Sequence, residues 1–134
     1  MEVQVQADRI ASPRARATEV GVDLVINARV DVFIREAGPA GARLGEAIRR
    51  GRAYRAAGAD CVYPIMVTDE DAIAALVDAF DGMVNVNARP EAPSLARLAE
   101  LGVARISFGP WLHRLAMARV DAALAAIRAG VDPW

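Results

Sequence analysis

The sequence contains no lysine, so all sixteen of its basic residues are arginines. Schiff-base catalysis and the P-loop both require a lysine, and its absence excludes them. Only one cysteine is present, Cys61, and a single cysteine cannot form an internal disulfide. Neither a charged and then apolar leader nor a long apolar run opens the chain. We therefore expect a protein of the reducing cytoplasm with no membrane partner.

A basic stripe of the kind that binds nucleic acid is also missing. The arginines are scattered among seventeen acidic residues, and the formal net charge is -1. This distribution excludes nucleic acid as a partner. What the chain does have is hydrophobic content, which is 54% of its 134 residues. Residues 1–134 are therefore predicted to form a single globular domain.

Short apolar segments alternate with helical patterns along the chain. The segments at about 23–29, 61–66, 83–87 and 104–108 are predicted to be strands. The helices between and after them carry apolar stripes, which we expect to be core: Leu44, Ile48 and Tyr54; Ile73, Leu76, Val77 and Phe80; Met117, Val120, Leu124 and Ile127. Strands that alternate with helices in this way predict an α/β fold with a parallel sheet covered by helices.

Helix boundaries are indicated by capping residues. Thr68 and Ser94 are the expected N-caps of two helices, and Pro110 is expected in the first turn of the last one. Near the beginning of the chain, Ser12–Pro13 is typical of a cap followed by a first turn. We therefore predict an N-terminal helix from about 13 to 20, which continues an earlier one if the preceding residues are also helical.

Polar side chains collect where the predicted strands end. In the segment DLVINARVDVF, residues 23–33, strand alternation sends Asn27, Arg29 and Asp31 to the same side. The carboxyl ends of parallel strands form the ligand-binding edge of α/β sheets, so these residues are candidates for binding a small anionic substrate with a carboxylate or phosphoryl group. The alternative is an internal ion pair between Arg29 and Asp31.

The later strands end in a second polar group. Asn85 and Asn87 lie in the third strand and Ser107 in the fourth, and we expect all three at the same rim. The two asparagines are candidate substrate ligands, although they would also serve as backbone caps. Ser107 and the following helix N-terminus would receive an anion, whereas a plain strand-to-helix turn explains the same residues.

Several linked segments resemble a known family. DLVINARVDVF, EAIRRGRAYRAAGADCVY and VNVNARPEAPSLARLAELGVARISFGP together are similar to the later half of the isocitrate lyase/phosphoenolpyruvate mutase superfamily. The resemblance implies a TIM-type (β/α)8 barrel, in which this chain would supply a parallel (β/α)4 half with strands five to eight. It also implies Mg²⁺-dependent lyase or phosphonomutase chemistry on a small 2-oxo or phosphonate acid, which makes or breaks a C–C or P–C bond.

The resemblance assigns a role to Arg29, which matches the family arginine that binds a substrate carboxylate. The family motif is Asn-Ala-Arg-Thr-Asp, and Val30 replaces its threonine here. Asn85 matches the family's Val-Asn-Val strand, whereas Asn87 and Arg89 replace an aliphatic residue and a glycine. No segment matches the family's Mg²⁺-binding Asp and Glu residues or its catalytic acid/base, so the chain offers no metal ligand and no assigned catalytic residue.

Two functions from different classes follow, and a third is weaker. The chain is either part of a lyase or mutase, or a catalytically silent half-barrel that assembles or binds a metabolite. The Gly-Pro turn after the fourth strand suggests, less strongly, another kind of phosphate-binding barrel. Four strands would leave two free edges and an inward face that we expect to be apolar, with Val25, Val84, Val86 and Ile106. We therefore expect a homo-oligomer, most simply a homodimer.

Overall fold

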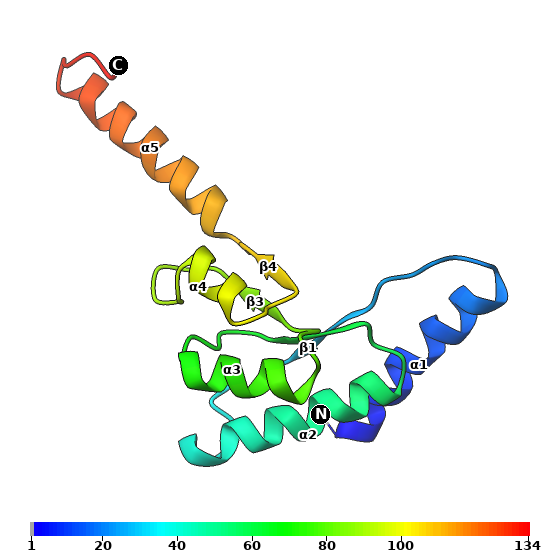
Figure 1. The fold of residues 1–134 in the computed structure, drawn as a ribbon. Coiled ribbons are helices and arrows are strands. Elements are labelled where there is room, and N and C mark those ends of the chain that lie inside the picture. Colours follow the sequence, from blue (N-terminus) through cyan, green and yellow to red (C-terminus); the bar gives the residue numbers. More distant parts are fainter. Residues whose placement is uncertain (1) are drawn as a thin grey trace.

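The structure is a computed structural model that describes residues 2–134, and it alternates helices with short strands (Figure 1). The helices are α1 (Val3–Glu19), α2 (Arg43–Ala56), α3 (Glu70–Ala79), α4 (Leu95–Glu100) and α5 (Trp111–Arg128), with a short 3-10 turn, η1 (Ala40–Ala42), before α2. The strands are β1 (Asn27–Val30), β2 (Cys61–Pro64), β3 (Asn85–Asn87) and β4 (Arg105–Ser107). Each strand lies within a segment for which the sequence predicts a strand, apart from the last residue of β1.

All pairings between the strands are parallel. β1 pairs with β2, with Asn27 opposite Cys61, and β3 pairs with β4. A single bridge between Val62 and Val84 joins the two pairs, which gives the spatial order β1-β2-β3-β4. The predicted α/β fold with parallel strands is therefore confirmed. That the four strands are one half of an eight-stranded barrel stays a prediction.

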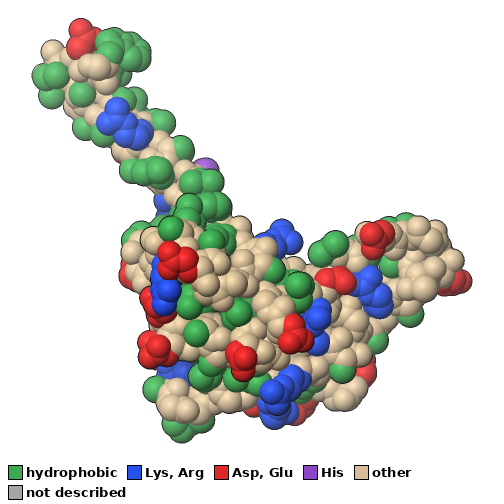
Figure 2. All heavy atoms as spheres, in the orientation of Figure 1, with side chains coloured by type: hydrophobic (Ala, Val, Ile, Leu, Met, Phe, Trp, Pro, Cys, Tyr) green, Lys and Arg blue, Asp and Glu red, His purple; other side chains and the backbone are tan. Residues whose placement is uncertain are grey.

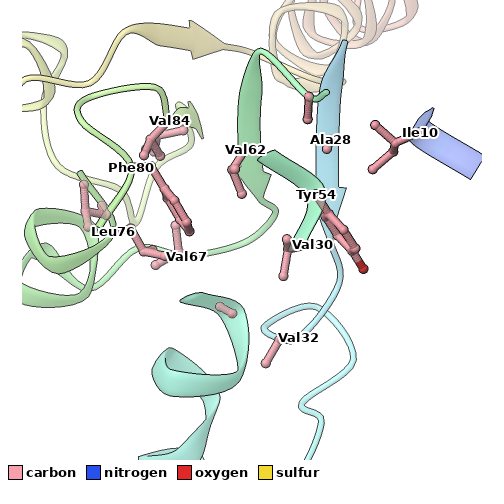
Figure 3. Packing of buried hydrophobic residues seen from close by; sticks show 14 of the residues in the cluster. Ile10, Ala28, Val30, Val32, Tyr54, Val62, Val67, Leu76, Phe80 and Val84 are labelled. Atoms are coloured by element: carbon pink, nitrogen blue, oxygen red, sulfur yellow. The ribbon is translucent and has the colours of Figure 1, made fainter. Parts of the chain in front are cut away.

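The core lies between the sheet and the helices that cover one of its faces. Val30, Val62 and Val84 are fully buried on this face and belong to one cluster with Leu76 and Phe80 (Figure 3). Side chains alternate along a strand, so the odd-numbered residues of each strand point to the opposite face. Two of the three predicted core stripes, on α2 and α3, contribute to this cluster.

The structure corrects the predicted direction of the apolar strand residues. Val84 and Val86 are fully buried against the helices, and Ile106 packs against the same cluster. Val25 precedes β1 and is 65% exposed. We expected the face without helices to be apolar, and the structure shows that it is not. The valines point toward the helices, and the polar residues lie on the opposite face.

Helix α2 approaches α3 closely through a glycine. A Cβ atom added at Gly51 would lie 2.2 Å from Cζ of Phe80, so only glycine fits at this contact. Phe80 is buried, and its ring cannot move away without disturbing the core. Gly45, in the same helix, has no atom within 4 Å of its added Cβ.

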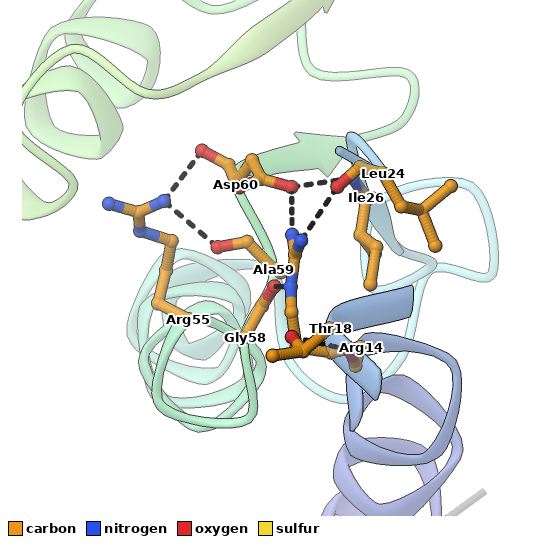
Figure 4. A network of polar contacts seen from close by, with 8 residues as sticks. All are labelled: Arg14, Thr18, Leu24, Ile26, Arg55, Gly58, Ala59 and Asp60. Carbon is orange, nitrogen blue, oxygen red and sulfur yellow. Dashed lines mark hydrogen bonds and ion pairs between the residues drawn. The ribbon is translucent and has the colours of Figure 1, made fainter. Parts of the chain in front are cut away.

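Arg14 of α1 makes hydrogen bonds with the loops that precede β1 and β2 (Figure 4). Arg14 donates from Nε to the carbonyl of Gly58 at 3.0 Å, from Nη1 to the carbonyl of Leu24 at 2.7 Å, and from Nη2 to Asp60. The Asp60 carboxylate also accepts the backbone N–H of Ile26 at 2.6 Å. Backbone groups from the loops before both strands are thus satisfied by two side chains.

One helix start differs from its prediction, and the N-terminal helix is the longer one that its prediction left open. Helix α1 begins at Val3 and continues to Glu19, with Pro13 inside it on an exposed position. The N-cap of α3 is Asp69, whose side chain accepts the backbone N–H of Ala72, and not Thr68. Ser94 caps α4 as predicted.

The last helix is the main departure from the predicted core. Figure 1 shows α5 projecting away from the sheet, and none of its residues is buried. Met117, Val120, Leu124 and Ile127, which the sequence predicts as core, are 42 to 57% exposed. Hydrophobic side chains along this arm are visible in Figure 2. The apolar stripe exists, but no other part of residues 2–134 covers it.

Candidate functional site

The sheet face without helices carries most of the candidate residues. By the strand register, Asn27 and Arg29 of β1 share this face with Asn85 and Asn87 of β3 and with Ser107 of β4. The odd-numbered positions of β1, β3 and β4 are thus polar, and β2 contributes Cys61 and Tyr63 between them. This arrangement brings together five of the six predicted site residues, and Asp31 follows directly after β1.

Arg29 is held by a carboxylate at the end of β1. Its Nε and Nη2 donate to Oδ1 and Oδ2 of Asp31 at 2.6 and 3.1 Å, a two-pronged contact. Arg35 reaches the same carboxylate at 3.5 Å. The predicted internal ion pair is therefore present, but the Arg29 side chain remains 55% exposed. Of its five N–H groups, three remain for a ligand.

The charges of this group are fixed at neutral pH. Burial alone would raise the pKa of Asp31, but hydrogen bonds and attraction from Arg29 and Arg35 outweigh burial and lower that pKa. The hydrogen bonds that Arg29 donates to Asp31 in turn raise the pKa of Arg29. One carboxylate thus faces two guanidinium groups, and the cluster keeps one unit of positive charge for an anion.

Three buried oxygen atoms on the polar face lack a hydrogen-bond partner. They are Oδ1 of Asn27, Oδ1 of Asn85 and Oγ of Ser107, considered among the residues that the structure describes. Asn85 is only 1% exposed, and Asn87 is 5% exposed and donates from Nδ2 to the carbonyl of Ser107 at 3.3 Å. Buried polar atoms are rarely left unpaired, so such atoms indicate a place for a water, a ligand or a further protein segment.

A cavity of about 520 Å³ opens beside the Arg29–Asp31 pair. Its walls come from the end of β1 and from α1 and α2, with Gln6, Arg50 and Tyr54 among the lining residues. Sequence reasoning missed these three because they lie on helices, where their spacing indicates an ordinary helix surface. Arg35 was missed as well, although its position four residues after Asp31 is a usable signal.

A second cavity, also about 520 Å³, lies between the loop after β3 and the beginning of α5. The Trp111 ring forms part of its wall, with the guanidinium carbons of Arg89 and Arg114 at 5.5 and 4.9 Å from the ring centroid. Arg89 donates to Glu91 at 2.6 Å. Its charge is therefore already engaged by a carboxylate and an aromatic ring.

The described residues do not fit a divalent metal. Within residues 2–134 no three His, Cys, Asp or Glu side chains lie close enough to hold an ion together. Asp31 lies beside the polar face, and two arginines already pair with it. Cys61 is buried, and burial raises the pKa of its thiol, so it is no substitute ligand or nucleophile.

None of the helices within residues 2–134 combines the length and the apolar character that crossing a bilayer requires.

Comparison with known families gives one match over nearly the whole chain. Residues 1–128 match the sequence profile described as phosphoenolpyruvate phosphomutase. No curated protein matches the chain at a significant level.

Solved structures agree with the family match. A proposed phosphonomutase from Burkholderia cenocepacia J2315 is 41% identical, with a TM-score of 0.84 over 97% of this chain and 52% of its own. A proposed lyase/mutase from the same organism is 33% identical, with a TM-score of 0.84 over 98% of this chain and 47% of its own. A 2,3-dimethylmalate lyase of the PEP mutase/isocitrate lyase superfamily, 24% identical, shares the fold with a TM-score of 0.77 over 99% of this chain and 47% of its own. The chain therefore spans about half the length of these structures.

Proposed function

The chain belongs to the phosphoenolpyruvate phosphomutase family, and on that premise we propose that it supplies the carboxylate-binding side of a lyase or mutase active site. The substrate class is a small 2-oxo or phosphonate acid, in line with the neighbours named as a phosphonomutase and a lyase/mutase. The observation that carries the proposal is the polar sheet face, which a half-exposed arginine shares with three buried oxygens that lack partners.

Arg29 is the residue that binds the substrate carboxylate in this proposal. Asp31 orients its guanidinium through two hydrogen bonds and leaves one edge of the fork free. A guanidinium presents paired N–H donors that match the two oxygens of a carboxylate. Binding there would fix the orientation of the acid and offset its negative charge while the neighbouring bond is made or broken.

Asn27, Asn85 and Ser107 are proposed to line the rest of the substrate site. Their unpaired oxygens accept hydrogen bonds, so they suit a hydroxyl group, an enol or an ordered water next to the bound carboxylate. An amide oxygen and nitrogen exchange places by a side-chain flip, which would let Asn27 or Asn85 donate to a carbonyl oxygen instead. Asn87 is proposed as a further ligand, because it is buried next to Ser107.

Family membership implies a metal-dependent lyase or mutase. Mg²⁺ is the metal proposed, and it would supply electrophilic stabilisation of an enolate-like oxygen. Because residues 2–134 do not fit such an ion, we assign metal ligation to none of them. The same mismatch favours a second candidate function, a metabolite-binding half-barrel that does not turn its ligand over.

The proposed completion of the fold is an eight-stranded barrel of which this chain supplies four strands. The relatives are about twice as long, and the bonding edges of β1 and β4 are free of strand partners within residues 2–134. An acid-rich segment that completes the barrel would favour the enzyme, and its absence from the functional protein would favour the silent module.

Nuclear magnetic resonance of the arginine side chains tests the carboxylate site directly. The Nε–Hε signals are recorded while the chain is titrated with pyruvate, and with the neutral pyruvamide as a control. We expect the Arg29 signal, identified through the Arg29→Gln variant, to shift with pyruvate and to stay in place with pyruvamide. Equal shifts with both compounds, or no shift at Arg29, would show that this residue does not bind the carboxylate.

A further inference from the structure

The cavity beside the Arg29–Asp31 pair is distinct from the polar sheet face. None of the three buried oxygens without partners belongs to a residue that lines this cavity, and Asn87 does not line it either. Apart from Arg29 and Asp31, its wall comes from the turn after β1 and from helices α1 and α2. The cavity is therefore a second place where a small ligand can bind.

The cluster around Asp31 forms one part of the cavity wall. Asp31 pairs with two guanidinium groups, those of Arg29 and Arg35, so this cluster has one positive charge in surplus. Arg35 reaches the carboxylate only from Nε, at 3.5 Å, and its side chain is 75% exposed. Its two Nη groups bond to no other described residue and remain for a ligand.

A second cluster of the same composition lies on α2. Nε of Arg50 donates to Oε1 of Glu46 at 2.6 Å, and Arg49 donates from Nε and Nη2 to Oε2 and Oε1 at 2.7 and 2.9 Å. The hydrogen bond from Arg49 is the largest cause of a lowered pKa at Glu46, so this carboxylate is ionised at neutral pH. One carboxylate again pairs with two guanidinium groups. Glu46 and Arg50 line the cavity, whereas Arg49 is not one of its lining residues.

The other lining groups suit an elongated polar ligand. Tyr54 of α2 and Gln6 of α1 offer a hydroxyl and an amide, and Val32 and Ala37 add apolar surface. The volume of about 520 Å³ is typical of a small-molecule site. A molecule that reaches the charges on both β1 and α2 therefore needs a short chain between its own charged ends.

We propose that this cavity binds a small dicarboxylate, with one carboxylate on Arg35 and the other on Arg50. Each cluster has one positive charge in surplus, so two negative charges compensate the two clusters, whereas a monoanion compensates only one. Arg50 is held at the wall by Glu46 and by a hydrogen bond with Tyr54, and its side chain is 23% exposed. A guanidinium that is already oriented loses little freedom when it binds a carboxylate.

Titration with dicarboxylates and with their monoamides tests for two charged contacts. Succinate, glutarate and adipate are each compared with the monoamide of the same length, which lacks one negative charge. The Nε–Hε signals of Arg35 and Arg50, identified through the Arg35→Gln and Arg50→Gln variants, are recorded by nuclear magnetic resonance at constant ionic strength. We expect the tightest dicarboxylate to shift both signals with a single dissociation constant. Its monoamide should bind roughly tenfold more weakly.

The matched variants separate a specific contact from net charge. Arg50→Gln should raise the dissociation constant of the tightest dicarboxylate roughly tenfold, to about that of the monoamide. Arg35→Gln should have the same effect, and because Arg35 is exposed and outside any helix or strand, the fold should be retained. Arg49→Gln removes the same charge from the same Glu46 carboxylate but outside the cavity, so it should change the constant by less than about threefold.

Four results would overturn the proposal. They are no shift at Arg35 and Arg50, equal affinity for each dicarboxylate and its monoamide, an equal loss of affinity in Arg49→Gln and Arg50→Gln, and shifts confined to Arg29, which would place the dicarboxylate at the polar face. The role proposed for Arg29 is tested separately by pyruvate. If pyruvate leaves the Arg29 signal in place while the dicarboxylate results are as expected, the proposed function fails and the second site is supported.

Discussion

Replacing Arg29 with glutamine separates ligand binding from stability at the polar face. The side chain is 55% exposed, and its pairing with Asp31 joins two partly solvated groups. Ion pairs with this much exposure contribute about 0.2 to 1 kcal/mol to folding. We therefore expect Arg29→Gln to lower the free energy of unfolding by about 1 kcal/mol or less. Urea denaturation of the unliganded chain measures this part.

The effect on a carboxylate ligand should be larger. A charge-assisted, two-pronged contact contributes about 2 to 3 kcal/mol, so the dissociation constant should rise roughly 30- to 150-fold. Titration with pyruvate, followed by the amide signals of residues at the ends of β1 and β3, measures the constant even for a weak ligand. The prediction is therefore that Arg29→Gln weakens ligand binding much more than it lowers the free energy of unfolding.

Arg35→Gln is the matched control, because Arg35 contacts the same Asp31 carboxylate from 3.5 Å and its side chain is 75% exposed. This variant removes the same charge, yet it should change the dissociation constant by less than about threefold, because only long-range attraction to the ligand is lost. Two results would refute the reasoning. An equal loss of affinity in both variants would reduce the effect to net charge, and a loss of several kcal/mol in stability for Arg29→Gln would make the Arg29–Asp31 pair structural.

Three further predictions follow from the structure. Gly51→Ala should lower the free energy of unfolding by about 1 to 2 kcal/mol, because the clash with Phe80 outweighs the gain in helix propensity. Gly45→Ala, which meets no neighbouring atom, should instead stabilise α2 by about 0.5 to 1 kcal/mol, and urea denaturation of the two variants measures both changes. The backbone hydrogen bond from Ile26 lowers the pKa of Asp60, so the ionised Asp60 carboxylate stabilises the fold above pH 3.8, its ordinary pKa, and this stabilisation is lost as the pH falls below that value. Asp60→Asn should therefore flatten the decline of the melting temperature between about pH 5 and pH 3. Calorimetric titration with Mg²⁺ should show no binding at micromolar metal, since the described residues provide no cluster of carboxylates, and a micromolar constant would reveal a site that the geometry lacks.

Strand positions and the grouping of polar residues could be predicted because both depend on local periodicity. Alternation alone placed Asn27 and Arg29 on the same side, and the register of the sheet agrees. The same rule, applied to Asn85, would have sent Val84 and Val86 to the opposite face. Their predicted direction is wrong because these valines have the opposite parity to Asn85 and Asn87 and pack in the core under the helices. In this sheet the valines pack under helices and the amides face away from them.

The helix ends and the environment of α5 were less predictable for different reasons. Thr68 and Asp69 are both good N-caps and adjacent, so composition cannot choose between them. Pro13 is tolerated inside α1 because its position is exposed, where water can satisfy the carbonyl that loses its partner. The stripe on α5 predicted a buried helix face, but a periodic pattern does not say which molecule covers it.

The balance of charge at the polar face limits what can complete the site. Covering that face with further strands would bury the Arg29 guanidinium, and the carboxylate that pairs with it, Asp31, is already shared with Arg35. A buried charge without enough compensation is costly, so the covering segment must bring acidic groups or leave room for an anionic ligand. A carboxylate substrate and an acid-rich segment with its metal both meet this requirement, and together they keep the site close to neutral. An apolar covering segment would not, since it would leave the positive charge and three unpaired oxygens buried.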